Sequence, residues 1–291
     1  MRVELRWRTE AAEDETAAKP LAMALWRPGP GWTMMSSGVL GGGLGAREWV
    51  LNAQVPGWYG RTDPAAHLAE LAAGLGLDGP GVGLLTAAQV TELVQRDDEG
   101  VQAAATVGIR VPTWAAAPAG VPDPELAPIR GLDQGRREPG QAPPGGWRPG
   151  TINIVVSVPV PLTPAAFVNA VVTATEAKSQ AVIEAGFAGT GTASDAICVA
   201  APTSAAALGT GRVPGERAAE DFTGPRSPWG ARIARAVHAA VLVGATAYRE
   251  KLGQSALSGA RQSSAIRSRS PGGALKLRCK ALEMHCSCLS A

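Results

Sequence analysis

The strongest constraint on the fold is a strand pattern that is followed at once by a helix start. Residues 151–160, TINIVVSVPV, alternate so that Ile152 falls on one face and Asn153 on the other, which is typical of a strand. Thr163 and Pro164 come next. A threonine hydroxyl caps a helix and proline suits its first position, so we predict a helix from this point.

The elements after this helix start favour an alternating order of strands and helices. The predicted helix runs to about Ala185, and Gly186 is its expected stop, because glycine tolerates the backbone found there. Residues 196–201 form a second apolar strand, and a last helix is expected at about 231–251. Strands that alternate with helices predict an α/β fold.

The first 111 residues carry weaker patterns. Asp63 and Thr86 each precede a helix-like segment and are the expected caps. In chain order we predict an edge strand within the first 30 residues, a short strand at 32–40, an ordered element at 47–55, helices at 64–74 and 86–95, and a strand at 102–111.

Glycine and proline mark a long loop at 115–150. The chain holds 36 glycines and 23 prolines among 291 residues, which is a smaller share than low-complexity chains have. We therefore interpret the chain as a single-domain sheet-and-helix architecture with a Pro/Gly-rich loop. Its parts are an N-terminal segment (1–31), the main domain (32–252) and a basic, Ser- and Cys-rich tail (253–291) that we expect to be disordered.

Charge and hydropathy exclude two classes of partner. The net charge is +2, but the basic residues are concentrated in the tail and leave the body slightly acidic, so we expect no nucleic acid as a partner. No run of about 18 apolar residues occurs, so we expect no membrane-spanning helix. The body keeps only Cys198, which suits a reducing compartment, and we expect a cytoplasmic location.

Common catalytic and metal-binding motifs are absent from the sequence. There is no phosphate-binding G-x-x-x-x-G-K-[ST], no H-E-x-x-H and no G-x-S-x-G. His67 and His238 each stand alone on a predicted helix. The tail residues Cys279, His285, Cys286 and Cys288 could hold a soft metal, but they fit no common zinc spacing. We expect no metal site.

The glycine cluster at 41–45 matches a dinucleotide-binding pattern only loosely. Gly41-x-Gly43-x-x-Ala46 is present, but Pro56 leaves room for only a short helix after it. We therefore expect no nicotinamide cofactor, and we interpret the glycines as a tight turn beside a ligand.

Polar residues interrupt several apolar elements, and a buried polar group needs a partner. These residues are Asn52, Gln54, Asn153, Glu176, Lys178 and Asp195. Glu176 shares one helical face with Thr173, whereas Lys178 points elsewhere. The alternative for Glu176 and Lys178 is that both are solvated helix positions.

An ordered series of blocks resembles the adenosylcobinamide amidohydrolases (CbiZ) over roughly residues 32–250. The blocks are SSGVLGGGLG (36–45), LNAQV (51–55), GLLTAAQV (83–90), ATVGIRVP (105–112), GTINIVV (150–156), TATEAKSQA (173–181), GTGTASDAICVA (189–200), FTG (222–224) and ARIARAVHAAV (231–241). The resemblance implies hydrolysis of the amide that joins aminopropanol to the corrin ring of adenosylcobinamide. The products would be adenosylcobyric acid and 1-amino-2-propanol, in corrinoid salvage. The corrinoid is the substrate, and no cofactor is expected.

Polar residues within these blocks are the expected substrate-binding residues. They are Ser36, Ser37, Asn153, Lys178, Thr190 and Thr192.

A second similarity concerns the nucleophile. The order Gly150-Thr151, strand, helix, glycine turn, Asp195 and strand looks like that of self-cleaving aminopeptidases and ornithine acetyltransferases. In those enzymes a Ser or Thr after the scissile bond becomes an N-terminal nucleophile. The similarity implies that Thr151 is the nucleophile, that Asp195 with Thr192 or Ser194 supplies polar partners, and that Asn52 donates to the oxyanion.

Two alternatives stay open from the sequence. In one, Glu176 or Asp195 is a carboxylate base that activates water. In the other, the chain binds a corrinoid without catalysis, since a binding protein needs the same apolar pocket with few polar anchors. The oligomeric state is also open, with a homo-oligomer as one alternative.

Overall fold

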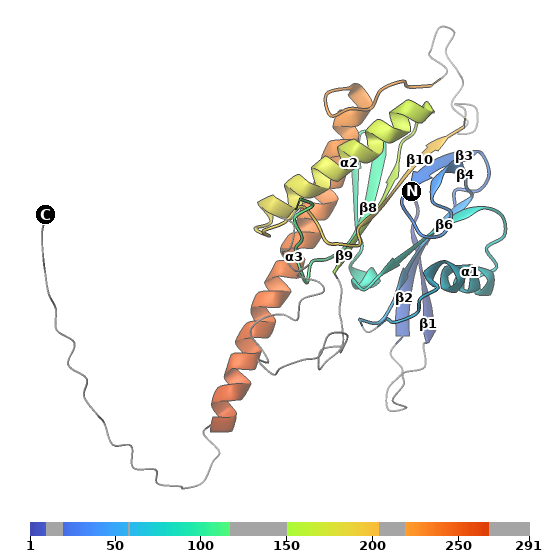
Figure 1. Cartoon of the computed structure of the whole chain (residues 1–291). Coiled ribbons are helices and arrows are strands. Elements are labelled where there is room, and N and C mark those ends of the chain that lie inside the picture. The colour runs from blue at the N-terminus through green and yellow to red at the C-terminus, as the bar shows by residue number, and fades with distance from the viewer. Residues whose placement is uncertain (10–19, 58, 117–149, 204–218, 268–291) are drawn as a thin grey trace, which may run out of the picture. The chain divides into compact units, whose positions relative to one another are not determined.

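The computed structural model describes residues 1–9, 20–57, 59–116, 150–203 and 219–267. Two compact units follow one another along the chain, residues 1–250 and residues 251–291. The described residues form one series of helices and strands. Its elements (Figure 1) are β1 (Glu4–Thr9), β2 (Pro20–Trp26), β3 (Trp32–Ser36), β4 (Gly43–Ala46), β5 (Trp49–Gln54), α1 (Pro64–Gly74), β6 (Gly81–Thr86), η1 (Val90–Glu92), β7 (Val94–Asp98), β8 (Val101–Gly108), β9 (Thr151–Ser157), α2 (Pro164–Glu184), β10 (Ala196–Pro202) and α3 (Pro228–Arg267).

The strands form two sheets. One has the order β1-β2-β5-β6 and the other β4-β3-β10-β9-β8-β7. Two neighbouring pairs, β5 with β6 and β9 with β10, are parallel, and the other pairs are antiparallel. Each parallel pair is joined by a helix, α1 or α2. The α/β fold predicted from the sequence is therefore confirmed.

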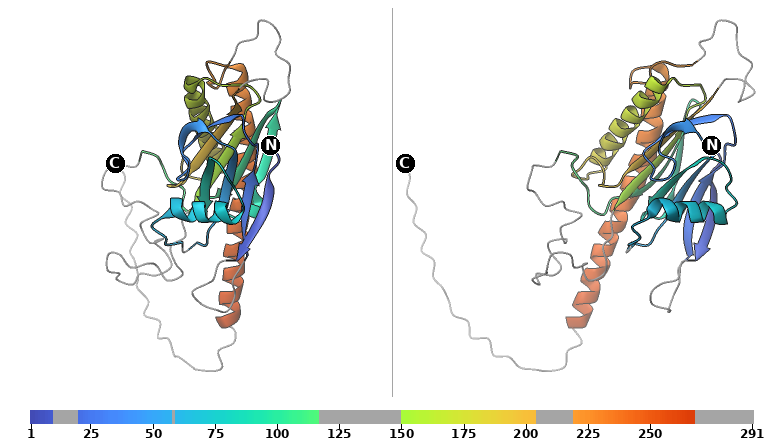
Figure 2. Two further views of the ribbon diagram at one scale, coloured as in Figure 1. Left: turned by 90° about the vertical axis from the view of Figure 1, so that its right-hand side faces the viewer. Right: turned by 45° about the vertical axis from the view of Figure 1, so that its right-hand side comes forward.

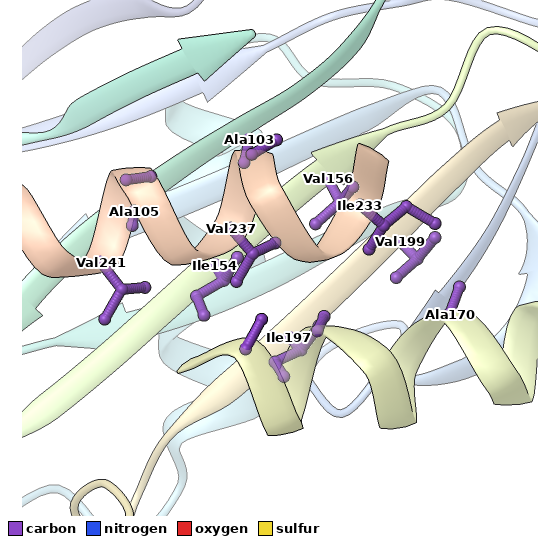
Figure 3. Close-up of a cluster of buried hydrophobic side chains, with 14 of the residues drawn as sticks. Ala103, Ala105, Ile154, Val156, Ala170, Ile197, Val199, Ile233, Val237 and Val241 are labelled. Carbon is purple, nitrogen blue, oxygen red and sulfur yellow. The ribbon is translucent and has the colours of Figure 1, made fainter. Parts of the chain in front are cut away.

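Helices cover the outer face of each sheet. In the six-stranded sheet, Ile154 and Val156 of β9 pack with Ala170 of α2 and with Val237 and Val241 of α3 in one buried cluster, which Figure 3 shows. In the four-stranded sheet, side chains of β2 and β5 pack against Leu68 and Ala72 of α1. Burial of these apolar side chains is the main stabilising contribution to the fold.

The inner faces of the two sheets pack against each other. Trp26 and Val50 of the four-stranded sheet share a buried cluster with Met34, Val155 and Cys198 of the six-stranded sheet. The layers are thus helices, sheet, sheet and helix (Figures 1 and 2). Because both faces of β9 are covered, every residue of this strand is buried.

The helix start at Thr163, the helix stop at Gly186 and the strand predicted at 196–201 are confirmed in the second half of the chain. The Thr163 hydroxyl accepts a hydrogen bond from Ala166 N at 3.3 Å, and Gly186 has a φ of +86° at the end of α2. The α3 helix runs to Arg267, past the expected end near residue 251, so residues 253–267 of the predicted disordered tail are helical.

Two predictions for the first half are wrong. The expected helix at 86–95 is a single 3-10 turn at 90–92, followed by β7, which pairs with β8. The Gln54 side chain accepts a hydrogen bond from Val90 N at 3.2 Å, so a tertiary contact replaces the helical one. Asp63 makes no capping bond, because its carboxylate binds Arg61 at 2.7 Å instead.

Parts of the predicted loops and tail lie outside the described residues, namely 117–149 and 268–291. Within the described part of the chain, no helix has the length and apolar character needed to cross a membrane.

Candidate functional site

The candidate site lies where β9 and β10 begin. These strands are parallel neighbours, with Asn153 opposite Ala196. Thr151 is the first residue of β9, and Asp195 directly precedes β10. The shared direction of the two strands therefore brings Thr151 and Asp195 to the same edge of the sheet, as the second similarity implied.

The Asp195 carboxylate accepts four hydrogen bonds from three segments of chain. Its Oδ1 atom accepts from Ile152 N at 2.9 Å and from the Thr192 hydroxyl at 2.5 Å. Its Oδ2 atom accepts from Lys178 Nζ at 2.5 Å and from Thr192 N at 3.1 Å. Asp195 thus fixes the start of β9, the helix α2 and its own loop relative to one another.

The Lys178–Asp195 ion pair is buried, with 9% of each side chain exposed. Lys178 lies on the buried face of α2, together with Ala174 and Ala181. A buried lysine needs an opposite charge, because removing it from water unpaired is costly. The alternative that Glu176 and Lys178 are both solvated is wrong for Lys178, whereas Glu176 is exposed.

Gly191 leaves the space in which Lys178 and Asp195 come together. A Cβ at this position would lie 2.2 Å from Asp195 Oδ2 and 2.5 Å from Lys178 Nζ. A side chain here would push the two charged groups apart. The GTGTASDA block therefore has a packing reason for its second glycine.

A chain of hydroxyl groups leads from Thr151 to the carbonyl of the preceding residue. Thr151 Oγ1 lies 2.9 Å from Ser194 Oγ, and the Ser194 hydroxyl donates to Gly150 O at 3.0 Å. The Thr192 hydroxyl lies 2.9 Å from the same carbonyl oxygen. Hydrogen-bond donors at a carbonyl oxygen favour nucleophilic attack on its carbon. The arrangement thus places a hydroxyl next to a polarised peptide bond.

Thr190 lies in the same loop but contacts the segment that follows β8 and not Asp195. Its hydroxyl accepts a hydrogen bond from Ala115 N at 3.2 Å, and its backbone N–H donates to Thr113 O at 2.9 Å. Thr190 therefore holds the segment that follows β8 against the loop.

Asn52 and Asn153 lie together between the two sheets. Asn153 Nδ2 donates to Asn52 Oδ1 at 2.9 Å and to Leu85 O at 2.8 Å. Asn52 Nδ2 donates to Thr106 Oγ1 at 3.0 Å. The cavity beside Asn52 has a volume of about 10 Å³, which is room for a single water molecule. Sequence reasoning missed Thr106, whose polarity in the apolar β8 pattern was the available signal.

The two serines lie at the end of β3, next to the start of β10. The Ser37 hydroxyl accepts a hydrogen bond from Ile197 N at 3.1 Å, and the Ser36 hydroxyl accepts one from Gly38 N at 3.0 Å. Of the glycines that follow, Gly41 and Gly42 turn the chain, whereas Gly43 and Gly45 lie in β4 and not in the predicted turn. Gly41 has a φ of +66°, and a Cβ there would lie only 1.9 Å from Gly81 O.

Other nucleophiles and bases in the described residues stand apart from this edge. Burial raises the pKa of the Cys198 thiol to about 12, so it is not a thiolate at neutral pH. His67 Nδ1 lies 2.9 Å from the Tyr59 hydroxyl, and His238 pairs with Glu184 at 2.7 Å. No cluster of three or more metal-ligating side chains occurs in the part of the chain that the structure describes.

Two comparisons with known proteins indicate the same family. The family model described as adenosylcobinamide amidohydrolase (CbiZ) matches residues 8–252, which include the whole edge described above. A Methanosarcina mazei protein named adenosylcobinamide amidohydrolase is 29% identical over 164 residues, which is 56% of this chain and 67% of the relative.

Proposed function

Because the chain belongs to the adenosylcobinamide amidohydrolase family and is a hydrolase acting on an amide, we propose that its substrate is adenosylcobinamide. Hydrolysis of the aminopropanol amide gives adenosylcobyric acid and 1-amino-2-propanol, and the former re-enters cobamide synthesis in the cytoplasm. Water is the only co-substrate. The observation that supports this site is the hydroxyl chain from Thr151 to Gly150 O, beside the buried Lys178–Asp195 pair.

In this proposal Thr151 is the nucleophile and is freed by cleavage of its own peptide bond. Thr151 Oγ attacks the Gly150 carbonyl carbon, the C–N bond breaks, and the hydroxyl proton passes to the Thr151 nitrogen. Water then hydrolyses the resulting ester and leaves a Gly150 carboxylate with a free Thr151 hydroxyl and amine. The hydrogen bond from Ser194 to Gly150 O supports this step, since it stabilises the charge that develops on that oxygen.

The freed Thr151 then acts on the substrate amide. Its amine takes the hydroxyl proton while Oγ attacks the amide carbon, and the proton leaves with 1-amino-2-propanol. Water hydrolyses the acyl ester and restores Thr151. The Ser194 hydroxyl is the proposed donor to the oxyanion, because the Thr192 hydroxyl donates to Asp195 and Asn52 donates to Thr106 between the sheets.

A carboxylate base is the rival mechanism, and two observations count against it. Asp195 already accepts four hydrogen bonds and pairs with Lys178. Its lone pairs are therefore occupied, which leaves little capacity to take a proton from water. Glu176 is exposed on α2, and no hydrogen bond joins it to Thr151 or Asp195 among the described residues.

The first experiment incubates the purified full chain with adenosylcobinamide and separates the products by chromatography. Intact-mass measurement of the same preparation gives the state of the Gly150–Thr151 bond. We expect adenosylcobyric acid and two fragments, 1–150 and 151–291. Corrinoid binding without product would contradict hydrolysis and support the binding-protein alternative. Product from an intact chain would support adenosylcobinamide as the substrate and would contradict the self-cleavage step.

A further inference from the structure

Trp114 is an exposed aromatic side chain on a segment that is fixed beside the candidate site. About half of it, 51%, is accessible to solvent. Exposed large apolar side chains occur singly on many surfaces, so exposure alone assigns no role. What distinguishes Trp114 is how its neighbours in the chain are held.

The residues on both sides of Trp114 are hydrogen-bonded to the loop that carries the site. Thr113 N donates to Gly191 O at 2.8 Å, and Thr190 N donates to Thr113 O at 2.9 Å. Ala115 N donates to the Thr190 hydroxyl at 3.2 Å. The indole is therefore attached to a backbone that cannot move independently of the loop.

The close packing of this loop reinforces the attachment. A Cβ on Gly189 would lie 2.7 Å from Thr113 N and 2.9 Å from Thr113 O. The next glycine of the block, Gly191, contacts both the Trp114 segment and the Lys178–Asp195 pair. The backbone that carries Trp114 is thus hydrogen-bonded to Gly191, the residue directly before Thr192 of the candidate site.

We infer that Trp114 binds the corrin ring of the substrate by stacking its indole against a face of the macrocycle. This inference rests on the proposed function, because the corrinoid is the ligand there. A corrin ring is broad and largely apolar, and it carries the reacting amide at its periphery. A ring that rests on Trp114 would lie beside the loop that carries Thr192 and Ser194, since Thr113 is hydrogen-bonded to Gly191. Aromatic stacking suits such a ligand, since it supplies contact area at low conformational cost.

The chain offers a matched control in Trp7. This residue is exposed to a similar extent, 56%, but lies on β1 at the edge of the four-stranded sheet. Truncation of Trp7 removes the same side chain from a surface that is not part of the candidate site. Trp114→Ala, Trp114→Phe and Trp7→Ala therefore form one series.

The test measures KM and kcat for adenosylcobinamide, and corrinoid affinity by titration of tryptophan fluorescence and visible absorbance. We expect Trp114→Ala to raise KM and the dissociation constant about 10- to 100-fold with kcat changed less than threefold. Trp114→Phe should recover most of the affinity, and Trp7→Ala should stay within twofold of the wild type. A purely structural role for Trp114 would lower thermal stability and kcat together, and that result overturns the inference.

The remaining outcomes separate this inference from the proposed function. If the wild type binds corrinoids but hydrolyses none, the proposed reaction fails, and the titration alone decides the role of Trp114. Equal affinity of Trp114→Ala and the wild type contradicts the inference. The inference is also contradicted if Trp114→Ala loses affinity for adenosylcobinamide but not for cobinamide without the adenosyl group, because the indole would then contact adenine.

Discussion

Two polar clusters interrupt the apolar strands of this fold, and they differ in what surrounds them. The edge cluster comprises Thr151, Lys178, Thr192, Ser194 and Asp195, and the inter-sheet cluster comprises Asn52, Thr106 and Asn153. Ser194 of the edge cluster is exposed, whereas the inter-sheet residues are at most 4% exposed. The edge cluster holds a buried ion pair and a Thr151 that is itself only 4% exposed, and its hydroxyl chain reaches the surface at Ser194. The inter-sheet cluster holds neutral groups that hydrogen-bond to one another, and Asn153 Oδ1 has no hydrogen-bond partner among the described residues.

The difference shows that a polar residue on an apolar strand is not by itself a sign of catalysis. Both clusters give the same sequence signal, a polar side chain at a position where apolar ones are expected. What separates the two clusters is the ion pair and the exposed Ser194 hydroxyl of the edge cluster, neither of which the inter-sheet network has. Four substitutions test this division, starting with the largest expected effect.

Thr151→Ala should abolish both the cleavage of the Gly150–Thr151 bond and the hydrolysis of the substrate amide. Without Oγ there is no nucleophile, so we expect kcat to fall by about a thousandfold or more, with the chain intact by mass spectrometry. Thr151→Ser keeps the hydroxyl and should retain both cleavage and activity. Full activity in Thr151→Ala would remove Thr151 from the mechanism.

Lys178→Met should destabilise the protein and also lower its activity. The Asp195 carboxylate would stay buried without its cation, and breaking a buried pair in this way costs about 3–5 kcal/mol. Urea unfolding measures the loss of unfolding free energy. The double variant Lys178→Met/Asp195→Asn should recover part of the loss, since it leaves no unpaired charge. A stable Lys178→Met protein would show that the pair is not structurally important.

Asn52→Ala should affect stability more than activity. It leaves Thr106 Oγ1 without its amide donor and removes one of the two acceptors of Asn153 Nδ2, which costs about 1–3 kcal/mol of unfolding free energy. We expect kcat/KM to stay within threefold of the wild type. The opposite pattern, a large loss of kcat in a stable protein, would return Asn52 to the oxyanion role that the second similarity implied.

Glu176→Gln should have the smallest effect. The side chain is exposed on α2, and surface substitutions of this kind change stability by about 0.5 kcal/mol or less. We expect kcat to remain within twofold of the wild-type value. A loss of activity comparable to that of Thr151→Ala would identify Glu176 as the base of the rival mechanism.

The sequence predicted the elements whose limits are set by local chemistry. The cap at Thr163 and the stop at Gly186 depend on residues within a few positions, and both are confirmed. The helix expected at 86–95 failed because its residues have distant partners. Gln54 binds Val90, and Val94 pairs with Ala105 of β8. Periodicity carries no information about such partners.

The candidate site was predictable to a similar extent. Its residue types and the positions of Thr151, Thr192 and Asp195 came from sequence blocks, but the contact of Asp195 with Lys178 did not. That pair depends on how α2 lies against the sheet. Asn52 and Asn153 are 101 residues apart, so nothing in either strand indicated that a second sheet covers them.

The strand order has a consequence for the two fragments that self-cleavage would produce. In the six-stranded sheet, β9 and β10 of the C-terminal fragment lie between β8 and β3 of the N-terminal fragment. Each fragment alone would therefore expose unpaired sheet edges, and the halves are held together by backbone ladders on both sides. A cut chain would run as two bands on a denaturing gel and as one particle in gel filtration. When residues 1–150 and 151–291 are co-expressed as two separate chains, we expect them to assemble into one folded protein.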